Sequence, residues 1–548
     1  MTSETGQAPT GAARLRVRIV APADAVTTAV AGRLAGSPGV ATAAAGAAGG
    51  ADAPVDLLVY RPPPDRSRPL APDLAVAGAE LEGCAGLRPR RLVLLSSAAA
   101  LDPDHHNPGY VSEGYRTAGR NPIARAWREL EALAAARLPG AERIVLRPAP
   151  VAARDGGVYF GRLLGGRTAV APPGYDPPLQ LLAPEDLAEA VAAAVERGAG
   201  RPGIYHVAPR GALPVRRAMA LAGVRRIPAG WSAAGGERAY LRYNWSVSGA
   251  RIERRLGFTP RRTSAEALLA AFGTAAGGEG GGAPAPEFDD FGLDERYIRR
   301  YERTLFRFLH DLWWRIEVRG LEHVPPSGRA VLTGMHRGFM PWDGVMALVA
   351  VRRGTGRTPR FLIHPALVKP PFLANYMTKL GGILACRENA DRVLGGDGLL
   401  GMFPEGIRGA FTMYRDAYRL GKFGRDEYVR MALRNRAPIV PFVTVGSAEI
   451  FPILGRLDWL WVRRATEWPF LPLAPNFPFP GLPLPSKWHT RFLDPVPVHE
   501  RHGPEAAEDR AVVAEISGEV RARMQAAIDG MLARRRSIFR GSVFDPPR

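Results

Sequence analysis

The sequence contains only two cysteines among its 548 residues, Cys84 and Cys386. They lie far apart in the chain and in different predicted domains, so they provide no disulfide framework. Such cysteine usage is typical of proteins in a reducing cytoplasm. The chain also lacks the roughly 18 consecutive apolar residues that a membrane-spanning helix requires. Its N-terminal segment has no basic start followed by an apolar run, so we expect no secretory signal. These absences predict a cytoplasmic protein.

Lysine is also scarce, because only four of the 73 basic residues are lysines and arginine supplies most of the formal net charge of +20. The charge is spread evenly over the chain and is not concentrated in a tail. Since no known nucleic-acid-binding module is present either, we expect no nucleic-acid partner. The positive balance instead favours anionic surfaces such as lipid headgroups. We therefore expect peripheral association with the inner face of the plasma membrane.

One segment of the chain has the composition of a linker. The stretch "GTAAGGEGGGAPAPE", residues 273–287, is rich in glycine and ends in Ala-Pro pairs, which is typical of a flexible connection with a stiffer end. A chain of this length also exceeds what a single hydrophobic core serves. Residues 1–272 and 288–548 are therefore the predicted domains.

Short apolar runs alternate with alanine-rich helical stretches in the first domain. The predicted strands cover residues 15–20, 55–60, 91–97 and 143–151. Residues 122–138 and 184–198 are predicted helices. Because strands that alternate with helices form parallel sheets, we predict a doubly wound α/β domain of the Rossmann type.

The order of these elements, with "LLSS", "RPAPV" and "GIYHVA" among them, resembles an extended short-chain dehydrogenase of the nucleotide-sugar epimerase type over residues 15–225. That family binds a dinucleotide on a glycine-rich turn and transfers hydride with a Tyr-x-x-x-Lys pair. Here Pro22, Ala25 and Thr28 stand at the glycine positions, and Ile123 and Trp127 replace the tyrosine and the lysine. Because proline removes an N–H donor and no ammonium is available, we expect neither NAD(P) binding nor oxidoreductase activity.

Two further polar clusters in this domain have alternative interpretations. Ser96 and Ser97 end the third predicted strand, where the dehydrogenase family has serine, but serines are also ordinary turn residues. The stretch "LDPDHHNPGY", residues 101–110, offers carboxylate and imidazole ligands for a metal. Its spacing matches no regular zinc pattern, so we favour a solvated loop without a metal.

The second domain carries four motifs in which an apolar run ends in polar residues, glycine or proline. The first, "AVLTGMH", delivers His336, "GGILACREN" delivers Arg387, and "GLLGMFPEGIRG" delivers Glu405. The fourth is "APIVP", residues 437–441. Because α/β folds build their clefts from the loops that follow strands, we expect these side chains to meet at one end of a sheet.

These four blocks, in this order, resemble the glycerolipid acyltransferase family, of the lysophosphatidic acid acyltransferase type, over residues 313–450. The resemblance implies an α/β domain that moves a fatty acyl group from acyl-CoA or acyl carrier protein to a lipid hydroxyl, with 1-acylglycerol-3-phosphate as the default acceptor. It further implies that His336 is the catalytic base and that Asp343 orients it. The family's usual spacing places the acid where Pro341 stands, so two extra residues must bulge out of this turn.

The resemblance also implies which residues bind the substrate. Arg387 corresponds to the arginine of the second block, and Glu405, Gly406 and Arg408 match the third block, which grips the acceptor's phosphate. Arginine suits this role because a planar guanidinium holds two oxygens at once, although both arginines could instead form structural salt bridges. Lys422 is a further candidate for the same cleft, and Glu405 could equally be the partner of Arg408.

The residue types fit the chemistry of acyl transfer to an alcohol. A hydroxyl is a poor nucleophile near neutral pH and needs a base, and an aspartate can fix the tautomer of that histidine and stabilise the imidazolium. No Gly-x-Ser-x-Gly motif is present and a thioester is already activated, so we expect direct transfer without a metal or a further cofactor. The alternative is a nucleotide-binding or scaffolding protein whose acyltransferase half has decayed, and the altered spacing after His336 is its only support.

Two aromatic segments either pack on the domain or face lipid. The apolar stripe of a predicted helix after the linker comprises Tyr297, Tyr301, Leu305, Phe308 and Leu312. The proline-rich stretch 451–488 carries Trp459, Trp461, Trp468 and Phe470. We favour a lipid-facing patch at headgroup depth for this second group.

Overall fold

The computed structural model describes residues 14–43, 55–117, 119–155, 158–229, 236–273, 289, 291–424, 426–475 and 483–544. The chain divides into two units, residues 1–292 and 293–548. Most of the predicted linker, residues 274–287, lies outside the described residues, so its flexibility stays a prediction.

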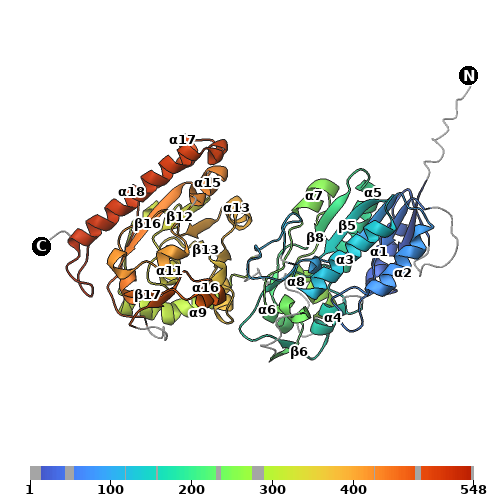
Figure 1. Cartoon of the computed structure of the whole chain (residues 1–548), viewed down its shortest axis with the longest axis horizontal. Coiled ribbons are helices and arrows are strands. Elements are labelled where there is room, and N and C mark those ends of the chain that lie inside the picture. The colour runs from blue at the N-terminus through green and yellow to red at the C-terminus, as the bar shows by residue number, and fades with distance from the viewer. Residues whose placement is uncertain are drawn as a thin grey trace, which may run out of the picture. The chain divides into compact units, whose positions relative to one another are not determined.

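The N-terminal unit is built on a six-stranded parallel sheet with the order β2-β1-β3-β4-β5-β8 (Figure 1). Its strands are β1 (Leu15–Val20), β2 (Val40–Ala43), β3 (Leu57–Tyr60), β4 (Arg91–Leu95), β5 (Glu142–Pro148) and β8 (Gly203–Val207). The strand order reverses between β1 and β3, which is the switch point of a doubly wound sheet. The Rossmann-like α/β fold predicted for this part of the chain is confirmed.

Helices cover both faces of this sheet because its strands are apolar on both faces. Val17 and Ile19 of β1 join a core with α1 and α5, whereas Val20 and Leu58 join a core with α2 and α3. These helices are α1 (Ala25–Ala35), α2 (Leu74–Ala85), α3 (Pro122–Arg137) and α5 (Pro184–Arg197). The unit also contains α4 (Val158–Gly165), α6 (Val215–Leu221), α7 (Ala250–Leu256) and α8 (Ser264–Phe272), with the strand pairs β6 (Thr168–Ala171) and β10 (Arg225–Pro228), and β7 (Pro178–Leu179) and β9 (Leu213–Pro214).

An ion pair occupies the switch point of the N-terminal sheet. Asp24 caps α1 by accepting a hydrogen bond from the Thr27 backbone N–H at 2.9 Å. Arg61 directly follows β3, and its Nη1 lies 2.7 Å from both oxygens of Asp24. In dinucleotide-binding folds the N-terminus of the first helix offers its N–H groups to a pyrophosphate. Here a carboxylate of the chain itself accepts from one of those donors and adds a negative charge.

The residues at the dehydrogenase motif positions have structural contacts. Ile123 is fully buried, and the indole N–H of Trp127 donates to the Leu70 carbonyl at 2.8 Å. The Ser96 hydroxyl donates to the Glu131 carboxylate at 2.6 Å. Ser97 caps the short 3-10 helix Ala98–Ala100. Both serines therefore stabilise local structure.

The Asp104, His105 and His106 side chains lie together on one loop. The Asp104 carboxylate is 2.9 Å from His106 Nδ1 and 3.3 Å from His105 Nδ1. Ligand atoms of all three residues lie within 4.8 Å of one another. The carboxylate thus contacts both imidazoles through Nδ1, and the expectation of a metal-free loop stays a prediction.

The buried His206 imidazole predicts a pH-dependent loss of stability in the N-terminal unit. Its Nδ1 lies 3.1 Å from the Val111 carbonyl oxygen. Burial lowers the pKa of His206 from 6.5 to about 3, and the charge of Arg147 adds to this effect. As the pH falls below about 6.5, the unfolded chain takes up a proton that the folded chain does not. The free energy of unfolding should therefore be highest above this pH and fall by about 1.4 kcal/mol per pH unit between about 6.5 and 3.

Denaturant unfolding of the full chain at a series of pH values measures this slope. Carboxylates also titrate in the acidic range, so the informative quantity is the difference between the wild type and the His206→Gln variant. We expect a shallower slope in the variant. Equal slopes in the two proteins would show that His206 does not cause the acid sensitivity.

The C-terminal unit contains a seven-stranded mixed sheet with the order β11-β19-β16-β12-β15-β13-β14. Its strands are β11 (Glu317–Arg319), β12 (Ala330–Gly334), β13 (Arg360–Ile363), β14 (Ile383–Leu384), β15 (Leu399–Met402), β16 (Ile439–Val445) and β19 (His489–Phe492). Among the described strands of this sheet, β16 and β19 are the one pair that runs antiparallel. The carboxyl ends of β12, β15 and β16 consequently meet at one edge, as the four motifs require. The predicted α/β fold of this half is confirmed.

Helices also cover both faces of this second sheet. The side chains of Leu332, Val440 and Phe442 form one core with α11, while α15 and the long C-terminal α18 pack against β16 or β12 from the other side (Figure 1). The helices of this unit are α9 (Glu295–Arg303), α10 (Leu305–Arg307), α11 (Trp342–Thr355), α12 (Leu373–Lys379), α13 (Arg387–Gly395), α14 (Ile407–Ala410), α15 (Glu427–Arg434), α16 (Leu460–Thr466), α17 (Val498–Arg501) and α18 (Arg510–Arg534). A strand hairpin, β17 (Gly455–Leu457) and β18 (Leu471–Leu473), flanks α16 in sequence.

The stripe predicted for the helix after the linker is packed at its start and exposed at its end, and whether the exposed part faces lipid stays a prediction. Tyr297 and Tyr301 on α9 pack against the core. Beyond α10 the backbone becomes a π-helix, Phe308–Trp313, and Leu312 is 67% exposed. None of the described helices combines the length and the apolar content needed to span a bilayer.

Candidate active site

His336 follows β12, the central strand of the C-terminal sheet, at the edge where the strands end. Its Nδ1 lies 2.7 Å from Oδ2 of Asp343, in the first turn of α11. The Asp343 carboxylate is buried and also accepts hydrogen bonds from the backbone N–H groups of Arg337 and Gly344, both at 2.8 Å. Three donors therefore fix the acid against the imidazole.

The turn between the two residues accommodates the two extra positions. Gly338 has a φ of +84°, and a Cβ atom there would meet the Ser447 carbonyl oxygen at 2.5 Å. Only glycine fits such a position without strain. The turn closes with a hydrogen bond from the Met340 N–H to the Gly338 carbonyl. The unusual spacing thus forms a bulge that returns Asp343 to the ring, as the dyad requires.

The hydrogen bond to Asp343 determines the tautomer of His336. A carboxylate accepts from Nδ1–H, so the neutral ring carries its lone pair on Nε2. The ring stacks on Phe403, with centroids 4.8 Å apart and planes at 26°. His336 also lines a cavity, and its side chain is 13% exposed. The free lone pair is therefore available to a hydroxyl in that cavity.

The cavity beside His336 has a volume of about 780 Å³, within the range typical of ligand sites. Most of the residues around it are apolar, including Val345, Leu348, Phe361, Leu373, Met377 and Leu380. The polar groups on its wall are few, among them His336, Lys369, Arg387 and Glu427. Such a site suits a long hydrocarbon chain with one reacting polar end.

Glu405 forms a buried ion pair with Arg337. The guanidinium donates to both oxygens of Glu405, at 2.6 and 3.1 Å, and the Gly421 N–H donates to Glu405 at 2.8 Å. Arg337 is 1% exposed and also donates to the carbonyls of His336 and Arg419. The partner of Glu405 is therefore Arg337 and not Arg408, and the pair connects the histidine turn to the loops after β15.

The other predicted substrate-binding residues lie at different distances from the cavity. Arg387 lines it at the start of α13, and its 60% exposed side chain makes a 3.4 Å contact with Asp391. Gly406 also lines it, with a φ of +57° that favours glycine. Arg408 and Lys422 are exposed and do not belong to its wall.

Two residues at the site were not predicted from the sequence motifs. Lys369 lines the cavity and lies 3.2 Å from Glu467. Arg337 was visible only as the neighbour of His336, and its burial could not be read from the sequence. The sequence motif instead suggested Arg408 as the partner of Glu405, because Arg408 is the arginine nearest to it in the chain.

Cys386 lines the cavity but does not have the properties of a nucleophile. Burial raises the pKa of its thiol from 9.0 to about 12, so the reactive thiolate is absent near neutral pH. Among the described residues of the cavity wall, His336, with Asp343 behind it, therefore remains the candidate for a reactive group.

Known proteins match part of the chain in sequence. Residues 315–445 match the family model for acyltransferases. Uncharacterized proteins of Mycobacterium tuberculosis and Mycobacterium leprae are 37% and 36% identical to this chain over 259 residues, which is 46% of this chain and 72% and 70% of theirs. Phytyl ester synthase 1, chloroplastic, of Arabidopsis thaliana is 26% identical over 254 residues, covering 42% of this chain and 36% of that protein.

Solved structures similar to part of the chain include MoeE5 in complex with UDP-glucuronic acid and NAD, at 14% identity and a TM-score of 0.38, covering 46% of this chain and 97% of that one. A UDP-galactose 4-epimerase structure has 15% identity and a TM-score of 0.35, covering 46% and 96%. The strand order of the N-terminal unit, and not these values, identifies its fold. The family match lies in the C-terminal half. Through its C-terminal half, the chain belongs to the acyltransferase family.

Proposed function

We propose that the C-terminal unit transfers a fatty acyl group from an acyl-CoA or acyl-carrier-protein thioester to a lipid hydroxyl at a membrane surface, and that 1-acylglycerol-3-phosphate is the acceptor, in phospholipid biosynthesis. The observation that carries this proposal is the His336 ring, held by buried Asp343, with its Nε2 lone pair available at an apolar cavity. The intact dyad argues against the alternative of a decayed, non-catalytic acyltransferase half.

The geometry supports direct transfer. The acceptor hydroxyl donates a hydrogen bond to His336 Nε2, and its oxygen attacks the thioester carbonyl as the proton moves to Nε2. Asp343 stabilises the resulting imidazolium. The tetrahedral intermediate then expels the thiolate, which takes the proton from the imidazolium. An ester and a free thiol are the products, and His336 returns to its starting state.

Arg387 and Lys369 support a phosphorylated acceptor. Both line the cavity that contains His336. A guanidinium and an ammonium can together bind a phosphate while the hydrocarbon chain occupies the apolar wall. Arg408 and Lys422, which do not line the cavity, contribute at most a positive field around it.

A second acceptor class is favoured by the apolar wall and by two of the relatives. The cavity has few charged groups for its volume, and Glu405 is already paired with Arg337. The Arabidopsis relatives are named as phytyl ester synthases. A phosphate-free long-chain alcohol is therefore the second candidate acceptor.

An acylation assay with two acceptors separates these candidates. The full chain is incubated with a long-chain acyl-CoA and either 1-acylglycerol-3-phosphate or a long-chain primary alcohol, and the esters are identified by mass spectrometry. We expect acylation of the phosphorylated acceptor, and a KM for it that rises about tenfold to a hundredfold in Arg387→Gln, since a charge-assisted hydrogen bond is lost. The matched control is Arg392→Gln, an exposed residue of the same helix that does not line the cavity.

The outcomes distinguish a phosphorylated acceptor, an alcohol acceptor and a decayed acyltransferase half. Esterification of the alcohol alone supports the second candidate, and an unchanged KM in Arg387→Gln removes that arginine from the acceptor site. The assay is repeated with an acyl-carrier-protein thioester as the donor, and the absence of any ester with either donor would support the decayed alternative.

We propose that the N-terminal unit is a non-catalytic scaffold that binds no NAD(P). The Asp24–Arg61 pair at the switch point and Trp127 in place of lysine support this proposal. Titration of the full chain with NADH, followed by its fluorescence, should show no saturable binding at millimolar concentration. Saturable binding that Arg61→Ala alters would overturn it.

A further inference from the structure

A group of exposed apolar side chains surrounds the start of α16. The tryptophan surface, as we name it, consists of Leu454, Trp459, Leu460 and Trp461, which are 64%, 46%, 68% and 67% exposed. The two indole rings stack, with centroids 6.0 Å apart and planes at 20°. Exposing large apolar side chains together is costly in water, and such patches mark contact surfaces.

Buried residues next to the tryptophan surface hold it in place. Val462, the third residue of α16, is 3% exposed and packs into the interior. Trp468 packs edge-on against Phe339 at 5.0 Å, and Phe470 is buried. Of the four aromatic residues expected to form one patch, two therefore face outward and two join the core. The outward pair is presented by ordered structure.

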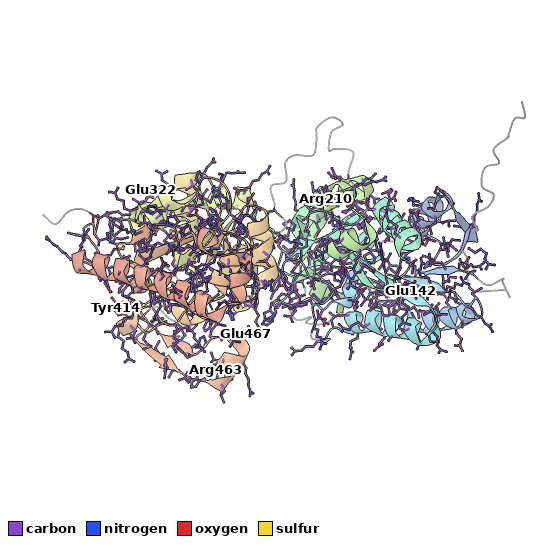
Figure 2. The ribbon with its side chains drawn as sticks, turned by 90° about the horizontal axis from the view of Figure 1, so that it is seen from above. Glu142, Arg210, Glu322, Tyr414, Arg463 and Glu467 are labelled. Atoms are coloured by element: carbon purple, nitrogen blue, oxygen red, sulfur yellow. The ribbon has the colours of Figure 1, made fainter. Side chains whose placement is uncertain are left out.

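Arginines accompany the apolar side chains. Arg463 and Arg464 on α16 are exposed, and Arg456 on β17 has a 63% exposed side chain, 3.7 Å from Asp458. Figure 2 shows Arg463 at the rim of the C-terminal unit, with Glu467 closer to its body. Three arginines and one aspartate give this region a net positive charge. Exposed tryptophans with neighbouring arginines match the composition of segments at the interface of an anionic bilayer.

The same helix leads to the cavity of His336. Thr466, the last residue of α16, and Trp468 line that cavity. Glu467, between them, pairs with Lys369 on the cavity wall. Seven helical residues span about 10 Å, so Leu460 and Trp461 at the start of α16 lie within roughly that distance of Thr466 on the cavity wall.

We propose that the tryptophan surface docks the C-terminal unit on an anionic lipid bilayer, so that a lipid acceptor reaches the cavity beside α16 directly from the membrane. The identity of the lipid that enters rests on the proposed function. The docking itself needs no catalysis. Charge and tryptophan exposure favour the bilayer over a second copy of this chain, which carries the same positive charge.

Vesicle sedimentation tests the docking. Full-length protein is mixed with vesicles of phosphatidylglycerol and phosphatidylcholine, or of phosphatidylcholine alone. We expect preferential binding to the anionic vesicles. The double variant Trp459→Ser/Trp461→Ser should lower the partition coefficient at least about tenfold, and Arg463→Gln/Arg464→Gln should lower it about thirtyfold. His336→Asn should bind like the wild type, which separates docking from catalysis.

Two controls keep the result interpretable. Thermal unfolding should be nearly unchanged in both surface variants because the substituted side chains are exposed. Activity on a water-soluble, short-chain analogue of the preferred acceptor should also be retained. Wild-type binding by both surface variants, or loss of self-association in size-exclusion chromatography without loss of vesicle binding, would overturn the proposal. Loss of activity in all assays with intact vesicle binding would instead count against the proposed function alone.

Discussion

Replacing His336 by asparagine is expected to lower kcat by about 10²- to 10⁴-fold, because the substitution removes the Nε2 base. An asparagine amide places an N–H close to the position of Nδ1, so it can keep the 2.7 Å contact with Asp343 and spare the fold. The KM for the acceptor should change little, since the apolar wall is untouched. Steady-state kinetics with acyl-CoA and the preferred acceptor measure both constants.

Asp343→Asn is the matched second variant. It preserves the size of a fully buried side chain, but its amide offers an N–H toward His336 and favours the wrong tautomer. We expect a loss of kcat similar to that of His336→Asn, and little further loss when the two are combined, because the residues act as a unit. A His336→Asn protein that retains kcat within about threefold of the wild type would rule out His336 as the base.

Glu405→Ala is expected to destabilise the C-terminal unit by about 3–5 kcal/mol, because it leaves the Arg337 guanidinium buried without its carboxylate. The same change also removes the acceptor of the hydrogen bond that the Gly421 N–H donates to Glu405 at 2.8 Å. Denaturant unfolding of the full chain, followed through the transition of this unit, gives the difference in free energy.

The control for this prediction is Arg408→Ala in the same motif. Arg408 is exposed and forms no ion pair with any residue that the structure describes, so its loss should change the stability by less than about 0.5 kcal/mol. A Glu405→Ala protein with wild-type stability but a raised KM for the phosphorylated acceptor would mean that Glu405 contacts the ligand. The ion pair would then be secondary.

Patterns of local sequence were sufficient for the fold and for the dyad. Buried strands such as Leu57–Tyr60 are short apolar runs, and their alternation with helices fixes a parallel sheet. His336 could be located because it ends such a run, and the "PWDG" sequence after it supplied Asp343. The bulge that joins them depends on Gly338, whose need for a positive φ is consistent with the sequence but not determined by it.

Contacts between distant loops could not be predicted in the same way. Arg337 and Glu405 are 68 residues apart and meet only because β12 and β15 are neighbours in the sheet. A sequence shows that both are charged, but not that both are buried. Lys369 was likewise not predicted as a site residue, since it lies in none of the motifs and lines the cavity from a loop.

The tryptophan-rich segment shows that composition does not predict which aromatic side chains are exposed. Trp459 and Trp468 lie in the same proline-rich stretch, yet the first is 46% exposed and the second packs on Phe339. The difference arises because α16 separates them and turns one end of the segment toward the core. Composition predicts that such a segment has an interfacial character, but only the packing of each ring shows which side chains face outward.

A crystal structure of the full chain with a bound long-chain alcohol would show whether His336 acts as the base, because it gives the distance between the acceptor oxygen and His336 Nε2. We expect a distance of about 2.6–3.2 Å, with the hydrocarbon chain along the apolar wall of the cavity. An alcohol bound in the reverse orientation, with its hydroxyl at Arg387 and its hydrocarbon end against His336, would contradict it.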